Sequence, residues 1–362
     1  MAVLEAGSVG IGASSRNAGM CHPGYSVGPR RLRTRYGETL GTAIYRDSED
    51  AYDLVKSVIA TEGIDAEVVE TGQLGLAFAP AHVPGLQAER IELAEAGTSS
   101  RFIPRSELRS ELESERYFGG LLAERCLGLN PARLVGGLAE ATVRAGAVIH
   151  EHTRATAVRR GRDGYVTVTT PRGSVRAGQV LVATSGHTDG LVPWLRRRIV
   201  SLSSYVIVTE PLPDELAFSV APRNRMFYDT KNFLYYWRLT PDRRLLFGGR
   251  ASFQPTSLER TARILYRGMT GIYPQLFGTR ITHGWSGRVD PDGNIHQFVT
   301  CAGGINDSKY CNEEVDALLN EARGLSDPAA RKQKYAAAMA ILLADLPIIY
   351  LYHTAWLYAL DK

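Results

Sequence analysis

The chain of 362 residues has little of several features that mark specialised classes of protein. Its four cysteines are too few for a disulfide framework at this size, and the lack of a His-rich companion motif argues against a zinc site. No apolar run approaches the length of a membrane span, and no charged-then-apolar signal segment opens the chain. We therefore expect a cytoplasmic protein with no metal and no membrane partner.

The chain also has only a small excess of positive over negative charge. The chain has 42 Lys and Arg against 38 Asp and Glu, a formal net charge of +4. The short arginine clusters at residues 30–33 and 196–198 are more simply solvated faces than a track for phosphates, so nucleic acid is not an expected partner. At this length two domains or one elaborated domain are expected, and nothing in the sequence indicates an oligomeric state.

Hydropathy patterning predicts a mixed α/β fold. Apolar spacing predicts a helix over 44–60, and Asn130-Pro131 predicts a helix start that ends at Gly146 and leads into a strand. Residues 66–80 predict a strand pair turned at Thr71-Gly72. Further predicted elements are helices at 82–97 and 105–113, hairpin strands at 164–178 and a buried strand at 179–186.

Residues 201–250 predict a run of antiparallel strands. In "NFLYYWRLT", alternation puts Leu234, Tyr236 and Arg238 on one strand face, with Tyr235 and Trp237 on the other. Tyr236 and Arg238 are candidates for a substrate pocket in which Arg238 pairs with a carboxylate. The alternative is a solvent-exposed arginine beside a packing tyrosine.

The opening stretch "VLEAGSVGIGASSRNAGM" indicates a nucleotide site. Val3 to Gly7 predict the end of a buried strand with Glu5 at its tip, the usual position of an acid that binds an adenosine ribose. The alternative for Glu5 is a surface carboxylate. Small residues from Gly10 to Gly19 would let backbone N–H groups approach phosphate oxygens.

Four stretches together carry a family resemblance: "VLEAGSVGIGASSRNAGMCHPGY", "TRATAVRRGRDGYVTVTTPRGSVRAGQVLVATSGHT", "SYVIVTEPL" and "LYYWRLTPDRRLLFGGR". In their order and spacing, roughly the first 290 residues resemble the FAD-dependent D-amino acid oxidase and glycine oxidase superfamily, and within it the gamma-glutamylputrescine oxidase-like branch. The resemblance implies oxidation of a small amine or amino acid by hydride transfer to FAD. It also implies a Rossmann-like FAD layer of residues 1–60 and 130–200, and an antiparallel substrate domain of residues 61–129 and 201–289.

The resemblance implies specific contacts as well. The FAD-binding residues that it implies are Glu5, Ala6, Gly12, Ala13, Ser14, Ser15, Arg16, Asn17, Ala18, Gly19, Val158, Ala183, Thr184 and Gly186. Arg16 occupies the place where some relatives bind flavin covalently through a histidine, so we expect a non-covalent cofactor; its alternative role is an ordinary loop cation. His22 is a candidate substrate contact or a structural loop histidine.

Both ends differ from the family pattern. Only Met1 and Ala2 precede the strand that ends at Glu5, whereas the G-x-G-x-x-G turn normally lies about 20 residues earlier. We therefore expect a chain without the first strand and turn of the family, and weak or lost FAD binding.

After Val289 the sequence resembles the C-terminal part of periplasmic solute-binding proteins of the peptide and nickel transporter type, with two amphipathic helices and a final apolar strand. That resemblance makes a Cys301–Cys311 bridge plausible in an oxidising compartment, but without an export signal we expect free thiols. Residues 290–362 would form a third segment, and a non-catalytic fusion protein is the alternative function. Solute capture outside the cytoplasm fits less well, because most of both lobes of such a protein is missing.

Overall fold

The computed structural model describes most of the chain up to residue 289 and a smaller part beyond it. The described residues are 1–25, 27–196, 202–249, 257–289, 301, 311–324, 327, 330, 333, 334, 337, 338, 340 and 341. They belong to two compact units, one of Met1–Val180 with Leu202–Val289 and one of Leu181–Ser201 with Asp290–Lys362. The predicted division into a cofactor layer and a substrate domain remains a prediction.

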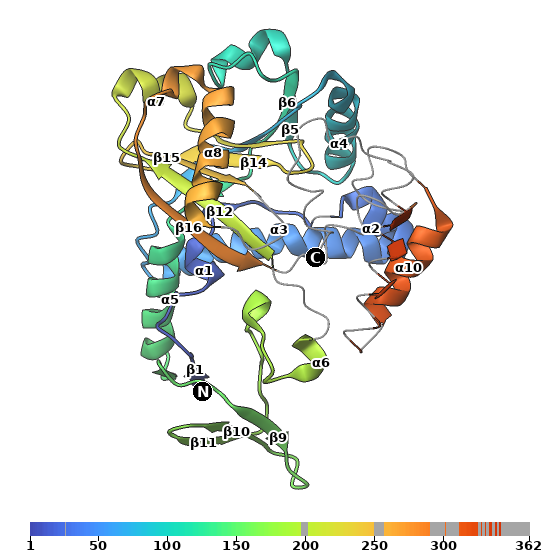
Figure 1. Ribbon diagram of the computed structural model, residues 1–362, viewed down its shortest axis with the longest axis vertical. Coiled ribbons are helices and arrows are strands. Elements are labelled where there is room, and N and C mark those ends of the chain that lie inside the picture. The colour runs from blue at the N-terminus through green and yellow to red at the C-terminus, as the bar shows by residue number, and fades with distance from the viewer. Residues whose placement is uncertain are drawn as a thin grey trace. The chain divides into compact units, whose positions relative to one another are not determined.

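An eight-stranded sheet is the largest element of the first unit (Figure 1). Its order is β16-β12-β15-β14-β13-β4-β6-β5. The strands are β4 (Gln73–Leu76), β5 (Ser100–Pro104), β6 (Gly119–Ala123), β12 (Leu202–Thr209), β13 (Met226–Asp229), β14 (Tyr235–Leu239), β15 (Leu245–Gly249) and β16 (Ile281–Val289). All neighbouring pairs are antiparallel except β13 and β4, which run parallel, so the predicted antiparallel domain is a mixed sheet.

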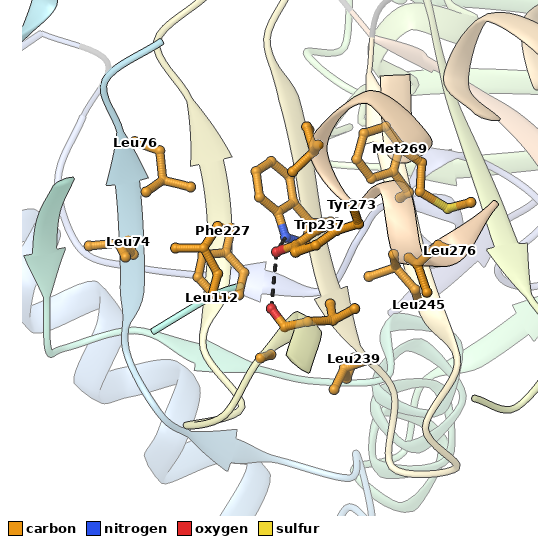
Figure 2. Close-up of a cluster of buried hydrophobic side chains, with 14 of the residues drawn as sticks. Leu74, Leu76, Leu112, Phe227, Trp237, Leu239, Leu245, Met269, Tyr273 and Leu276 are labelled. Carbon is orange, nitrogen blue, oxygen red and sulfur yellow. Dashed lines mark hydrogen bonds between the residues drawn. The ribbon is translucent and has the colours of Figure 1, made fainter. Parts of the chain in front are cut away.

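The main core lies on one face of this sheet, where helices α7 (Asp214–Val220) and α8 (Leu258–Ile272) pack. Trp237 at its centre is completely buried and stacks between Phe227 and Phe247, with ring centroids 5.4 and 5.7 Å away. Its indole N–H donates to the Tyr273 hydroxyl at 2.9 Å, and that hydroxyl donates to the carbonyl oxygen of Val220 at 3.0 Å (Figure 2). The Trp237 indole N–H and the Tyr273 hydroxyl therefore both have hydrogen-bond partners although they are completely buried.

A smaller α/β layer is formed by residues that precede β4 and residues that lie between β6 and β12 in sequence. Strands β1 (Ala2–Leu4) and β8 (Val148–His150) pair in parallel, and helix α5 (Pro131–Arg144) leads into β8. The predicted helix start is confirmed, because the Asn130 side chain accepts hydrogen bonds from the backbone N–H groups of Ala132 and Arg133. Strands β9 (Ala157–Arg160), β10 (Val166–Thr170) and β11 (Gly173–Ala177) form a separate antiparallel sheet.

The remaining elements of the first unit are mostly helical. They are helices α1 (Ala13–Arg16), α2 (Pro29–Tyr36), α3 (Glu38–Thr61) and α4 (Val83–Glu95), the 3-10 turns η1 (Pro80–His82), η2 (Arg105–Ser110) and η4 (Pro274–Leu276), and a three-stranded sheet of β2 (Met20–Cys21), β7 (Leu127–Gly128) and β3 (Val69–Glu70). Among the described residues, no helix has both the length and the apolar composition needed to cross a membrane.

Three predicted elements differ from the structure. The strands of residues 66–80 do not pair with each other, because β3 pairs with β7 while β4 joins the large sheet. Residues 105–113 contain only the 3-10 turn η2, and the predicted strand at 179–186 is absent, with Leu181 90% exposed. Apolar residues alone predicted that strand, and they do not show whether a neighbouring strand is available to pair.

The second unit contains the 3-10 turn η3 (Ser185–His187) and helices α6 (Pro193–Arg196) and α10 (Glu313–Gly324). Cys301 and Cys311 are joined by a disulfide bond, so the expectation of free thiols is wrong. That expectation rested on the compartment rather than on the distance between the two residues. The predicted final strand lies outside the described residues.

We predict that Tyr273→Phe lowers the free energy of unfolding by about 2 kcal/mol, because it leaves the Trp237 indole N–H and the Val220 carbonyl buried without their partner. Urea denaturation measures the change. Tyr266→Phe is the matched control, since the Tyr266 hydroxyl accepts its hydrogen bond from Gly278 N–H at an exposed position. Equal losses in the two variants would contradict the role of the buried hydrogen bonds.

Candidate functional site

Glu5 directly follows the carboxyl end of β1, as its place in the sequence predicts. The strand itself is not buried as predicted, since the Val3 side chain is exposed. Glu5 Oε1 accepts a hydrogen bond of 2.7 Å from Gly7 N–H. Beyond the end of β1 the backbone remains hydrogen-bonded to β8 and the residues after it. Glu5 N–H donates to His150 O, and Thr153 N–H donates to Glu5 O. The carboxylate is thus fixed at the strand edge where an acidic residue binds ribose in dinucleotide folds, and its second oxygen has no hydrogen bond among the described residues.

Polar side chains of residues 7–19, which we call the glycine loop, form hydrogen bonds with the backbone of the same loop. The Ser15 hydroxyl donates to Gly10 O. The Asn17 amide donates to Ser14 O at 2.8 Å and accepts from Gly19 N–H at 2.8 Å. Ser15 and Asn17 therefore hold the loop in shape, which the sequence alone did not indicate.

The glycine loop is also hydrogen-bonded to side chains of the large sheet, on the face opposite the aromatic core. Trp285 on β16 donates its indole N–H to Arg16 O at 2.8 Å. Arg238 on β14 donates its Nε–H to Ala18 O at 2.7 Å. A Cβ on Gly287 would lie 3.7 Å from the Cβ of Ala13, so the backbone of β16 also approaches the loop closely.

The sheet presents mainly apolar side chains beside the loop. The members of this apolar face are Ala18, Met20, Val206, Val208, Tyr236, Leu246 and Trp285. A pair of hydroxyls, Tyr236 OH and Ser204 Oγ, lies among them at 2.9 Å. The side-chain alternation that predicted Tyr236 on this face is confirmed. Trp285 and Ser204 were missed. Alternation along β12 with Val206 and Val208 could have placed Ser204 on this face. Alternation from Ile281 could not have placed Trp285 there, because Ile281 packs against the aromatic core and a register shift separates it from the rest of β16.

Arg238 is on the predicted face but has neither of the predicted environments. Its side chain is buried, with an exposed fraction of 5%, so it is not a solvent-exposed arginine. Its guanidinium donates to backbone carbonyl oxygens of Ala18, Leu129 and Leu239, at 2.7, 2.7 and 3.2 Å. These acceptors occupy the groups that would have paired with a substrate carboxylate.

The other predicted residues are more dispersed. His22 is exposed, and its Nδ1 lies 2.8 Å from Pro23 O. Val158 lies on β9 and pairs with Val168 on β10. A last group, Ala183, Thr184 and Gly186, belongs to the second compact unit. The structure therefore brings together residues of the glycine loop and the sheet, and the binding roles of these residues remain predictions.

Two thiols lie just beyond the loop. Cys21 is on β2 and Cys126 precedes β7. Burial raises the pKa of Cys126 to about 12 and also raises the pKa of Cys21. Because the thiolate is the reactive form, neither side chain is suited to nucleophilic catalysis at neutral pH. Within the part of the chain that the structure describes, no group of His, Cys, Asp and Glu could hold a metal ion.

The fold is similar to that of known flavoenzymes. It superposes on the crystal structure of glycine oxidase from Geobacillus kaustophilus with a TM-score of 0.64 and 19% sequence identity, over 80% of this chain and 75% of that one. This similarity establishes the mixed α/β fold. A family profile described as "FAD dependent oxidoreductase" matches residues 1–306, and the chain belongs to this family, for which FAD is the cofactor.

Individual relatives agree with the family. The chain is 29% identical over 291 residues to the gamma-glutamylputrescine oxidoreductase of Escherichia coli strain K12, which covers 79% of this chain and 67% of that protein. A shorter match of 70 residues, at 35% identity, is to the di/tripeptide-binding protein 4 of Pseudomonas aeruginosa, and it covers 18% of this chain and 13% of that protein. The family match continues to residue 306, beyond the predicted junction near residue 290.

We predict that Gly19→Ala disrupts the glycine loop and lowers the free energy of unfolding by more than about 2 kcal/mol. Gly19 has a φ of +66°, and a Cβ there would lie 1.9 Å from the carbonyl oxygen of Leu129. Left-handed strain alone costs about 1–2 kcal/mol, and the steric clash adds to it.

The matched control for that prediction is Gly24→Ala, because Gly24 also has a positive φ, +100°, but its Cβ would meet nothing within 4 Å. Thermal or urea denaturation of both variants separates the clash from the backbone strain. If Gly19→Ala were no more destabilising than Gly24→Ala, the close contact with Leu129 would not exist in solution.

Proposed function

We propose that the chain oxidises a small amine or amino acid with FAD as electron acceptor, at the face of the sheet beside the glycine loop. The main support for this proposal is a pair of hydrogen bonds between the glycine loop and the sheet. Trp285 donates to Arg16 O and Arg238 donates to Ala18 O. This arrangement sets a loop of small residues, suited to a dinucleotide, against an apolar surface that would exclude water from the reaction.

The residues of the loop fit an FAD molecule. Glu5 is held at the strand edge by Gly7 N–H and would accept hydrogen bonds from the ribose hydroxyls. The small residues from Gly12 to Gly19 would allow backbone N–H groups to approach the pyrophosphate. When bound, FAD would supply the two-electron acceptor that removes a hydride from the substrate.

The apolar face would orient the substrate. Tyr236 and Trp285 provide aromatic surface for the carbon chain of an amine, and the hydroxyl pair of Tyr236 and Ser204 offers a hydrogen bond to a polar group. Since Arg238 is engaged by backbone carbonyls, a carboxylate on the substrate would need another cation, and Arg16 in the exposed part of the loop is the candidate.

Spectroscopy tests the proposal directly. The sequence alone led us to expect weak or lost FAD binding. Because the chain belongs to a family of FAD-dependent oxidoreductases, we now propose that protein incubated with FAD and desalted retains the visible absorption bands of oxidised flavin. Under anaerobic conditions, gamma-glutamylputrescine or glycine, the compounds named for the E. coli and G. kaustophilus relatives, should bleach these bands. Protein that binds no FAD, or bound flavin that no amine or amino acid reduces, would contradict the proposal.

A substitution tests the ribose contact. We predict that Glu5→Gln weakens FAD binding about tenfold, equivalent to 1.4 kcal/mol, because an amide offers a single weaker acceptor to the two ribose hydroxyls. Glu62→Gln is the control, since Glu62 forms an exposed ion pair with Arg144 at 2.9 Å outside the loop. Fluorescence titration of apoprotein with FAD measures both affinities, and an unchanged affinity in Glu5→Gln would rule out the ribose contact.

A further inference from the structure

Arg238 joins three separate segments through one side chain. The guanidinium of this β14 residue donates to Ala18 in the glycine loop, to Leu129 just before helix α5, and to Leu239 in its own strand. The first two bonds are both 2.7 Å long. A planar guanidinium with fixed N–H directions can bind two carbonyl oxygens from different segments at once, whereas a lysine ammonium is a compact charge without that fork.

The environment of Arg238 is unusual for a cation. The side chain is buried, and none of the ion pairs among the described residues includes it. Burial lowers the pKa of Arg238, and the negative charge of Glu67 opposes that shift. An arginine nevertheless remains protonated, so its charge is balanced mainly by the dipoles of the backbone carbonyls.

The two carbonyl groups belong to a tight junction. Leu129 N–H donates to Gly19 O at 2.8 Å, and the carbonyl oxygen of Leu129 lies where a side chain on Gly19 would be. Arg238 binds this carbonyl and that of Ala18, the residue before Gly19. Its guanidinium therefore fixes the end of the glycine loop against the start of helix α5.

We infer that Arg238 is a positioning residue, which holds the glycine loop in the conformation that receives FAD and does not itself contact substrate. The expected effect of Arg238 on FAD binding rests on the proposed function. Its effect on the loop does not, because the hydrogen bonds to Ala18 and Leu129 are made by the chain alone.

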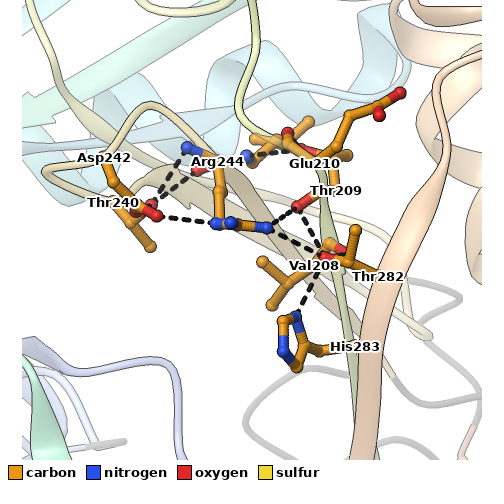
Figure 3. Close-up of polar contacts among 9 residues, drawn as sticks. Val208, Thr209, Glu210, Thr240, Asp242, Arg244, Thr282 and His283 are labelled. Carbon is orange, nitrogen blue, oxygen red and sulfur yellow. Dashed lines mark hydrogen bonds and ion pairs between the residues drawn. The ribbon is translucent and has the colours of Figure 1, made fainter.

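The test compares two arginines. Arg238→Lys and Arg238→Gln remove the guanidinium that binds both carbonyl oxygens. Arg244→Lys is the matched control. Arg244, the residue just before β15, also binds a backbone carbonyl, that of Thr209 at 3.2 Å. Its other side-chain partners are Asp242 and Thr282, and none belongs to the glycine loop (Figure 3).

Amide hydrogen exchange of apoprotein gives the first readout. We expect amides of residues 13–21 to exchange at least tenfold faster in both Arg238 variants, with unchanged exchange in the core strand β15. Arg244→Lys should leave residues 13–21 as protected as in the parent chain. Unchanged protection of this segment in Arg238→Lys would overturn the inference.

FAD titration of the same proteins gives the second readout. We expect at least tenfold weaker binding in Arg238→Lys and less than a twofold change in Arg244→Lys, at a temperature where all remain folded by circular dichroism. Equal FAD affinity in Arg238→Lys and the parent would overturn the inference. If the parent binds no FAD, the proposed function fails, while the exchange data still decide the positioning role.

Discussion

The hydrogen bonds from Arg238 to the carbonyl oxygens of Ala18 and Leu129 connect the large sheet to the loop on which the proposed FAD contacts depend. The neighbouring residue, Trp237, points to the opposite face and forms the centre of the aromatic core. Strand β14 thus anchors the core with one side chain and the candidate site with the next. A shift of one residue in its register would exchange these two environments and bury the guanidinium among aromatic rings.

Much of the local structure could be predicted because it depends on short-range chemistry. The Asn130 cap and the side-chain alternation of β14 each follow from neighbouring residues, and both are present in the structure. Glu5 was correctly placed at a strand end for the same reason. Family resemblance added the fold and the cofactor, which periodicity alone could not have supplied.

The errors and omissions concern contacts between distant segments. Alternation shows which face Arg238 occupies, but it does not show that carbonyl groups of residues 18 and 129 will lie there. Trp285 was missed for the same reason, because its indole binds a carbonyl of residue 16. The strand predicted at 179–186 failed because strand formation needs a partner, which apolar composition does not reveal.

The parallel pairing of β4 with β13 affects how the sheet is assembled during synthesis. In the sheet β4 lies between β6, which is synthesised before β12, and β13, which is synthesised much later. While the ribosome is still translating the intervening residues, one edge of β4 has no partner, and its backbone N–H and C=O groups are open to other chains. The nascent protein can therefore aggregate through this open edge of β4 until residues 226–229 have left the ribosome and can pair with it.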